Sequence, residues 1–234
     1  MDESAVTVIR GGQSVEGNTT DRYESWPVPG TERARLSFGA GGETAGSLGT
    51  GDPGTGARTG TETFADDPSM LARDLATAAE SPHRLRYETP RLDAPVHVSG
   101  RVVPSLTVSF EEPTVVSGAL VEYTGDGADV VTRGWADPLN RPRYDEYETP
   151  LSYRQSIRES APLDGGGVRV EFPLQATDHV FESGSRLGVV VYASDKAFTL
   201  HTPGNREVTL SLGDSSVGLP VVGGESAVDE AVGE

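Results

Sequence analysis

The sequence contains no cysteine and only one lysine, Lys196. Without cysteine the chain forms no disulfide, and it offers neither a thiolate nucleophile nor a thiolate metal ligand. A Walker A phosphate loop requires Gly-Lys-Ser/Thr, and Lys196 follows Asp195 and precedes Ala197, so this nucleotide-binding motif is excluded as well.

Long apolar runs are also missing. No stretch approaches the roughly 20 apolar residues that span a bilayer. The start, Met1-Asp2-Glu3, lacks the basic region and the apolar stretch of a signal peptide. We therefore predict a cytoplasmic chain with no membrane partner.

Positive charge is scarce, because 19 Lys and Arg residues face 36 Asp and Glu residues, for a net charge of −17. Nonspecific nucleic-acid binding depends on clustered Lys and Arg, so we predict no nucleic-acid partner. A surface rich in carboxylates and nearly free of lysine indicates a host with high internal salt, because dense negative charge repels itself until counterions screen it. GC-rich codon usage combined with an acidic tail is the alternative explanation.

The 234 residues include 29 Gly and 16 Pro, and 35% are hydrophobic, which indicates a globular chain with many loops. We predict one domain over residues 1–222, followed by a flexible acidic tail over 223–234. Residues 1–32 are polar and are expected to form an extended lead-in whose Trp26 fills a groove on the body. Residues 39–63 are expected to form a long glycine-rich loop, because they contain too little apolar surface to offset ordering entropy.

A single short helix is predicted over residues 67–81. Asp67 is a suitable N-cap, and Pro68 fits the first helical position, where its missing N–H costs nothing. Leu71 and Leu75 then recur near one face, as expected for a surface helix that covers a sheet edge.

After residue 83 the apolar residues recur with a period of two, which is typical of strands. Turn residues such as Gly125-Asp126-Gly127 separate the runs. Many short strands and almost no helix predict an all-β fold, a β-sandwich. The expected strands cover residues 83–88, 94–99, 102–110, 115–124, 129–135, 166–172, 186–193, 197–201, 206–212 and 215–221.

No motif in the chain carries recognisable catalytic chemistry. The strings Gly12–Gly17 and Gly213–Gly218 place the second glycine one position too late for a Gly-x-Ser-x-Gly nucleophile elbow. The histidines show no paired spacing of a zinc site, and a histidine such as His179 commonly satisfies a backbone carbonyl. Asp126 and Asp129 could hold Ca²⁺ in a turn, but they lack the spacing of a known calcium loop, and a solvated hairpin is the favoured explanation. We predict no catalytic residue, no metal site and no cofactor.

Aromatic and arginine side chains gather in a few places and are the candidates for an interface or a cleft. The long connection over residues 136–153 is the main one, because long loops in compact domains are usually functional. Such residues serve as anchors of protein interfaces and also stack on sugar rings. The candidates are Trp26, Trp135, Arg141, Arg143, Tyr144, Tyr147 and Tyr153.

An ordered set of short strings extends over about residues 23 to 223. The set comprises Trp26-Pro27, Leu85-Arg86-Tyr87-Glu88-Thr89-Pro90-Arg91-Leu92, Val96-His97-Val98-Ser99-Gly100, Leu120-Val121-Glu122-Tyr123, Thr132-Arg133-Gly134-Trp135, Asp178-His179-Val180-Phe181, Gly184-Ser185-Arg186-Leu187-Gly188-Val189-Val190-Val191 and Ser215-Ser216-Val217-Gly218-Leu219-Pro220-Val221-Val222. In this order the strings resemble the C-terminal β-sandwich domain of Xaa-Pro dipeptidyl-peptidases and cocaine-esterase-like serine hydrolases. The fold that this resemblance implies is a jelly-roll β-sandwich of the galactose-binding-domain type.

The resemblance implies a non-catalytic domain that packs on an upstream α/β-hydrolase domain and helps to wall its substrate cleft. The Ser, Asp and His of the triad would belong to that upstream domain, so no triad residue is transferred to this chain. The parent enzyme would hydrolyse an ester or peptide bond through an acyl-enzyme, including the release of Xaa-Pro dipeptides. Arg141 and Arg143 would pair with carboxylates across the seam between the domains.

Two other functions remain open on the sequence. A free-standing carbohydrate-binding module would need coplanar exposed rings on one sheet face. A metal-dependent enzyme would need His97, His179 or His201 to converge with carboxylates. Association into a homo-oligomer is compatible with all three interpretations.

Overall fold

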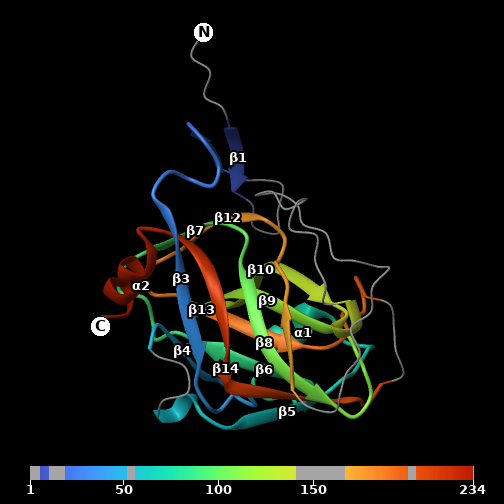
Figure 1. Ribbon diagram of the computed structural model, residues 1–234. Helices are drawn as coiled ribbons and strands as arrows, with labels where there is room; N and C mark the ends of the chain where they lie inside the picture. The colour runs from blue at the N-terminus through green and yellow to red at the C-terminus, as the bar shows by residue number, and fades with distance from the viewer. Residues whose placement is uncertain (1–5, 11–18, 52–55, 141–166, 200–203, 234) are drawn as a thin grey trace.

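The computed structural model describes residues 6–10, 19–51, 56–140, 167–199 and 204–233, without the side chains of residues 9, 10, 19, 20 and 57. Figure 1 shows the elements along the chain. The strands are β1 (Val6–Arg10), β2 (Thr19–Tyr23), β3 (Thr31–Phe38), β4 (Gly46–Gly49), β5 (Thr61–Ala65), β6 (Arg84–Glu88), β7 (Val96–Gly100), β8 (Val103–Phe110), β9 (Val116–Thr124), β10 (Gly127–Ala136), β11 (Val168–Glu171), β12 (Thr177–Phe181), β13 (Arg186–Tyr192) and β14 (Glu207–Val222). The helices are α1 (Ala72–Thr77) and α2 (Gly224–Val232), with two 3₁₀ turns, η1 (Gly56–Arg58) and η2 (Pro138–Asn140).

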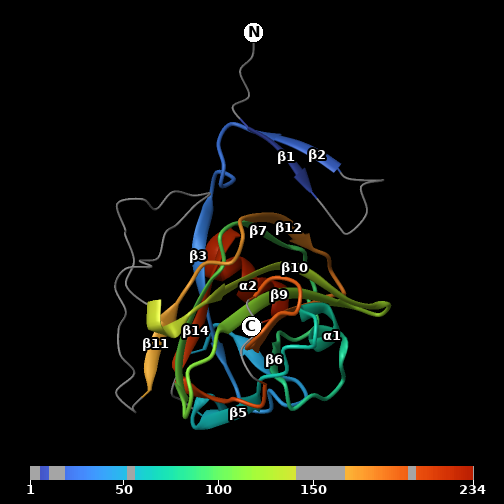
Figure 2. The ribbon, with the colours of Figure 1, turned by 90° about the vertical axis from the view of Figure 1, so that its right-hand side faces the viewer.

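The strands form two layers that curl around one core (Figure 2). One layer has the order β10-β9-β13-β6, with every neighbouring pair antiparallel. The other is built around β14, which pairs with β3, β5, β7 and β8. Strand β4 joins the layers, because it runs antiparallel to β3 and parallel to β6. The predicted all-β sandwich is therefore confirmed.

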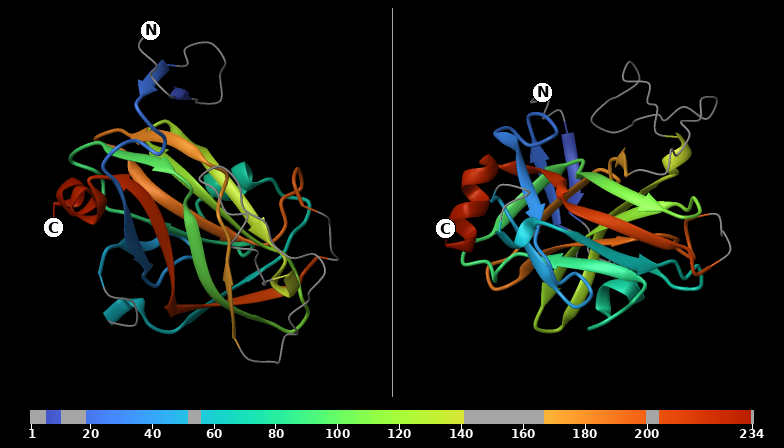
Figure 3. Two further views of the ribbon diagram at one scale, coloured as in Figure 1. Left: turned by 45° about the horizontal axis from the view of Figure 1, so that its top comes forward. Right: turned by 60° about the horizontal axis from the view of Figure 1, so that its bottom comes forward.

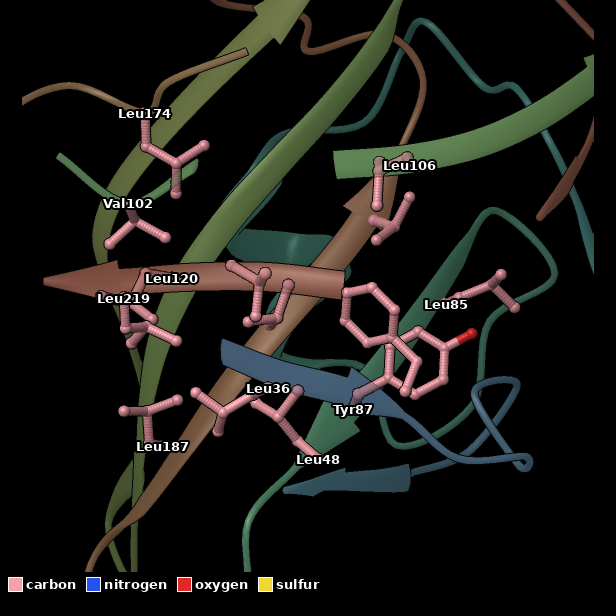
Figure 4. Close-up of a cluster of buried hydrophobic side chains, with 14 of the residues drawn as sticks. Leu36, Leu48, Leu85, Tyr87, Val102, Leu106, Leu120, Leu174, Leu187 and Leu219 are labelled. Atoms are coloured by element: carbon pink, nitrogen blue, oxygen red, sulfur yellow. The ribbon is translucent and has the colours of Figure 1, made fainter. Parts of the chain in front are cut away.

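Apolar side chains from both layers meet between the sheets (Figure 4). Leu36 and Leu219 come from the β14 layer, and Leu85, Leu120 and Leu187 come from the β10 layer; each is at most 1% exposed. Alternation along each strand sends every second residue inward, which is why a period-two sequence pattern builds this core.

The helix α1 is shorter than predicted, and its start differs. Asp67 does not cap it; instead its carboxylate accepts hydrogen bonds from the backbone N–H and the hydroxyl of Ser69, which makes a local turn. The helix begins after Leu71. Its Leu75 packs with Val121 and Val190 on the outer side of the β9–β13 layer, so the helix covers the face of this layer, whereas the expectation was a helix over a sheet edge.

The glycine-rich segment over residues 39–63 is not one long loop, because it contains β4, η1 and the start of β5. Glycine permits the close approach of β4 to β6: a Cβ on Gly46 would lie 2.6 Å from Cδ1 of Tyr87. The turn before β4 is also ordered, because the Glu62 carboxylate accepts the N–H groups of Gly41 (2.6 Å) and Gly42 (3.2 Å). The N–H groups of this glycine turn therefore bind a carboxylate of the same chain, Glu62.

Two predicted strands, 206–212 and 215–221, are parts of the single strand β14. The turn signal at Gly213-Asp214 marks a change of register between Ser211 and Ser216, where β14 passes β8. The predicted strand at 197–201 is a turn over its described residues, since the N–H groups of Phe198 and Thr199 both donate to the carbonyl of Asp195.

Both ends of the chain differ from expectation. The lead-in contains the hairpin β1–β2, which lies above β7 and β12 in Figure 2, and Trp26 after it is half-buried. The tail forms the helix α2 beside β3 (Figure 3). Val228 and Ala231 are at most 1% exposed and belong to the core, so a face with apolar residues three positions apart holds this acidic segment in place.

Candidate docking face

A hollow of 540 Å³ lies at the end of β10, beside the turn η2. It is bordered by three chain segments: the connection between β8 and β9, the residues that follow Gly134, and the segment between β13 and β14. Its lining residues are Pro113, Thr114, Val115, Trp135, Asp137, Leu139, Phe198, Thr199 and Arg206. The lining is mainly apolar, as expected for a site that receives an apolar group.

Two aromatic rings and one guanidinium form a stack at this hollow. The ring centres of Trp135 and Phe198 are 5.8 Å apart, and the ring planes are inclined by 30°. The guanidinium carbon of Arg133 lies 4.8 Å from the centre of the Phe198 ring, within the range of a cation–π contact. Phe198 is nevertheless 49% exposed, so the stack holds the ring in place without covering it.

Asp195 fixes the turn that presents Phe198. Its carboxylate is fully buried, accepts the N–H of Ala197 at 3.0 Å, and faces an Nη of Arg133 at 3.3 Å and the Tyr192 hydroxyl at 3.5 Å. Its backbone N–H donates to the Thr199 hydroxyl at 2.9 Å. Burial, followed by the charge of Asp195, raises the pKa of the Tyr192 phenol, which therefore remains a hydrogen-bond donor. Phe198 is thus displayed on a rigid turn.

A second buried carboxylate, Asp66, supports the same turn from below. It accepts the backbone N–H and the hydroxyl of Ser194, both at 2.9 Å, and the hydroxyl of Thr114 at 3.4 Å. Thr114 lines the hollow and Ser194 precedes Asp195, so Asp66 connects two walls of the site.

The exposed large hydrophobic side chains of the described residues are Phe198 and Leu71, and both lie near this turn. The N–H of Lys196 donates to the carbonyl of Met70 at 3.0 Å, which places the segment before α1 next to the turn. Exposed apolar side chains gathered at one place mark an interaction surface. We call Trp135, Leu139, Phe198, Lys196 and Leu71 the docking face.

The charged groups around the hollow differ in how they are engaged. Arg206 has its Nε 3.3 Å from Glu112, and the carboxylate of Asp137 accepts the N–H of Leu139 at 2.9 Å. Lys196 is exposed, and its ammonium group has no ion-pair partner within the described part of the chain. The docking face therefore presents one unneutralised positive charge in a protein of net charge −17.

The predicted site residues have different outcomes. Trp135 lies in the hollow. Trp26 lies elsewhere, before β3, where the neighbouring Val28 N–H donates to the Ser99 hydroxyl of β7. Five candidates fall outside the described residues: Arg141, Arg143, Tyr144, Tyr147 and Tyr153.

Sequence reasoning missed Phe198 and Lys196, because the apolar residues from 197 onward were interpreted as a strand. One signal was available, namely Ser194-Asp195 two positions before Ala197. Aspartate commonly bonds to the backbone N–H two residues further on and so starts a turn.

The three described histidines pair with carboxylates or with backbone, and no nucleophile joins them in the described residues; His201 lies outside the described residues. Nε2 of His179 lies 2.8 Å from Glu122, which ties β12 to β9, and Nε2 of His97 lies 3.0 Å from Asp178. Only His83 bonds to a carbonyl, that of Ala65, so the expectation for His179 was wrong in its partner. A group of three or more potential ligands that could hold a metal is absent from the described ranges.

The serine strings give no nucleophile elbow where the structure describes them. Ser215 lies inside β14, is fully buried, and accepts the N–H of Thr107 at 2.9 Å. The other string, Gly12–Gly17, lies outside the described residues. The Trp135 and Phe198 rings are inclined rather than coplanar, so they do not form the flat platform that sugar binding would need. No helix in the described part is long and apolar enough to span a bilayer.

Comparison with known proteins gives a family match over almost the whole chain. The family described as the X-Pro dipeptidyl-peptidase C-terminal non-catalytic domain matches residues 4–227. A putative Xaa-Pro dipeptidyl-peptidase of Rhodopirellula baltica is 37% identical over 174 residues, which are 70% of this chain and 26% of that protein. A protein of the same description from Bacillus cereus is 27% identical over 229 residues, 95% of this chain and 35% of that protein. The chain thus spans about a third or less of these relatives.

Solved structures show the same fold. An α-amino acid ester hydrolase superposes with a TM-score of 0.69 at 18% identity, covering 94% of this chain and 41% of that chain. A CocE/NonD family hydrolase from Staphylococcus aureus gives a TM-score of 0.67 at 14% identity, covering 92% of this chain and 41% of that chain. In each case the chain matches a part of a longer protein.

Proposed function

Because the chain belongs to the family of X-Pro dipeptidyl-peptidase C-terminal non-catalytic domains, we propose that it is the accessory β-sandwich of a serine hydrolase. In this role it packs on an α/β-hydrolase catalytic domain and shapes one wall of the substrate cleft. The catalytic serine, histidine and aspartate belong to that partner domain.

The family match carries this proposal, and the docking face supports it. Phe198 is about half exposed on a rigid turn, which leaves apolar surface in contact with water. Such a side chain is typical of an anchor that a partner covers. The buried carboxylates of Asp195 and Asp66 accept hydrogen bonds that stabilise that turn, so they are not available for acid–base chemistry.

The reaction of the whole enzyme is proposed to be the release of Xaa-Pro dipeptides from peptide N-termini through an acyl-enzyme. The relatives' descriptions as Xaa-Pro dipeptidyl-peptidases support this substrate class. Arg141, Arg143, Tyr144, Tyr147 and Tyr153 follow Leu139 and Asn140 in sequence, so we propose that they extend the seam, together with Trp135. Trp26 is proposed as a separate contact, because it is half-buried and its neighbour Val28 binds Ser99 of β7, whereas Trp135 lies at the hollow.

Turnover by the isolated chain tests the non-catalytic half of the proposal. The purified chain is incubated with Ala-Pro-p-nitroanilide and with a p-nitrophenyl ester, with and without a serine-directed inhibitor. We expect no hydrolysis above that of a buffer blank. Hydrolysis that the inhibitor abolishes would refute the proposal.

We also propose that the chain works in the cytoplasm of a cell with high internal salt. The net charge of −17 and the single lysine support this, because such a surface is stabilised only when salt screens its self-repulsion.

A further inference from the structure

The docking face combines an apolar hollow with Lys196, a positive charge that has no ion-pair partner in the described part of the chain, and this combination restricts what can cover it. The hollow of 540 Å³ is large enough for one or more apolar side chains, and its rim carries Phe198, which is 49% exposed. Lys196 precedes Phe198 by two residues on the same rigid turn. An occupant that buries Phe198 therefore comes close to the Lys196 ammonium group.

Where the structure describes them, the arginines beside the face pair with carboxylates of this chain, so we take Lys196 as the described cation that sets the sign of the partner. Arg133 pairs with Asp195, and Arg206 lies against Glu112. Within the described ranges, Lys196 has no such carboxylate. An unpaired ammonium group that is covered by an interface needs a carboxylate across it, because a buried charge without a partner costs several kcal/mol.

We propose that the hollow beside Trp135 and Phe198 receives an apolar side chain from a segment of the catalytic domain, and that a carboxylate on this segment pairs with Lys196. This inference rests on the proposed function and adds the position and the chemistry of the contact. A second copy of this chain is a poorer occupant, because two chains that each carry a net charge of −17 repel each other at low salt.

Titration calorimetry with two variants tests the proposal. The full chain is titrated into the catalytic α/β-hydrolase domain that is proposed as its partner. Phe198→Ala removes the exposed anchor and should weaken binding about 30-fold, which is the loss of affinity expected when an anchor residue at an interface is truncated to alanine. Lys196→Glu should weaken it about tenfold, with a loss that shrinks as KCl is raised, because charge pairs at an interface are screened by salt.

Arg33→Glu is the matched control for the charge change. Arg33 is exposed on β3, and its register partner in the sheet is Pro220, near the end of β14. The hollow is at the other end of β14, because its lining residue Arg206 directly precedes this strand. This variant should bind like the wild-type chain. Thermal unfolding of each variant shows whether it is folded, and sedimentation velocity reports self-association.

The possible outcomes separate this inference from the proposed function. Wild-type binding with unchanged affinity in Phe198→Ala and Lys196→Glu would overturn the inference and leave the accessory-domain role standing. No binding by the wild-type chain would overturn the role itself. Wild-type self-association that Phe198→Ala abolishes would identify a second copy as the occupant and overturn the inference.

Discussion

Arg84 is a fully buried cation that pairs with carbonyls instead of a carboxylate. Its guanidinium donates to the carbonyls of Gly42 and Glu43, at 2.7 and 2.8 Å, and to those of Leu75, Ala78 and Ala79. It thereby joins the end of α1 to the turn before β4. Burial lowers the pKa of Arg84, and the nearby charge of Arg86 lowers it further.

Replacing Arg84 by Met should destabilise the protein by about 3 kcal/mol or more, because buried carbonyls lose their charged donor. Denaturant unfolding measures the change in free energy of unfolding. Arg33→Met, at an exposed position, is the control and should change it by less than about 0.5 kcal/mol. Equal stability of the two variants would contradict this role for Arg84.

Glu122 makes stability depend on pH. Burial alone would raise its pKa, but the hydrogen bonds that it accepts from His179 and the Glu182 N–H outweigh burial and lower the pKa below its ordinary value of 4.5. The folded protein therefore holds the charged form more strongly than the unfolded chain does. Its contribution is fully present above pH 4.5 and is lost as the pH falls through the lower, folded-state pKa.

Glu122→Gln should therefore be less stable than the wild-type protein at pH 7, with a difference that narrows as the pH is lowered below 4.5. Free energies of unfolding at several pH values measure the narrowing. The exposed Glu80→Gln is the control and should follow the wild-type curve. A difference that is constant with pH would contradict the assignment.

At the scale of elements, the position of β4 depends on glycine. A side chain on Gly46 would collide with the Tyr87 ring of β6, so Gly46→Ala should destabilise the fold by about 2 kcal/mol. Gly125→Ala is the matched control, because a Cβ there meets nothing within 4 Å. Thermal unfolding compares the two, and similar melting temperatures would contradict the role assigned to Gly46.

The helix α2 is expected to contribute to stability, although its sequence is acidic. Val228→Asp places a charge in the core and should destabilise the protein by about 3 kcal/mol or more. Glu230→Asp, on the exposed side of the same helix, should change little. If both variants unfold at the wild-type denaturant concentration, α2 is not part of the folded core.

The sequence predicted the elements in which local pattern and packing agree. Strands β6 to β10 were found because their apolar residues alternate and glycine or proline separates them. Strand β4 was missed because the residues Gly46–Gly49 include no β-branched or aromatic side chain. Its glycine is explained by the close approach to the Tyr87 ring, which leaves no room for a Cβ on Gly46. Helix α2 was missed because its buried apolar side chains, Val228 and Ala231, are few among acidic neighbours.

The candidate site was predictable only in part for the same reason. Trp135 was among the predicted candidates because aromatic side chains anchor interfaces, and the structure places it at the hollow. Phe198 was not, because its exposure depends on Asp195 and Arg133, and Arg133 is distant in sequence. A contact between distant residues leaves no local pattern.

At the scale of the whole molecule, the net charge of −17 predicts that salt stabilises the fold. The distance over which charges act falls from about 10 Å at 0.1 M salt to about 3 Å at 1 M, so self-repulsion between carboxylates disappears over this range. The melting temperature should rise steadily with KCl up to molar concentrations. A melting temperature that is independent of KCl would contradict the proposed adaptation to salt.

The central claim is that this β-sandwich completes a neighbouring catalytic domain and breaks no bond itself. The most direct test is to measure kcat/KM for Ala-Pro-p-nitroanilide with the isolated catalytic α/β-hydrolase domain while the chain is added in increasing amounts. The account predicts that kcat/KM rises and saturates at one chain per catalytic domain, whereas a value that stays constant at every concentration of the chain would contradict it.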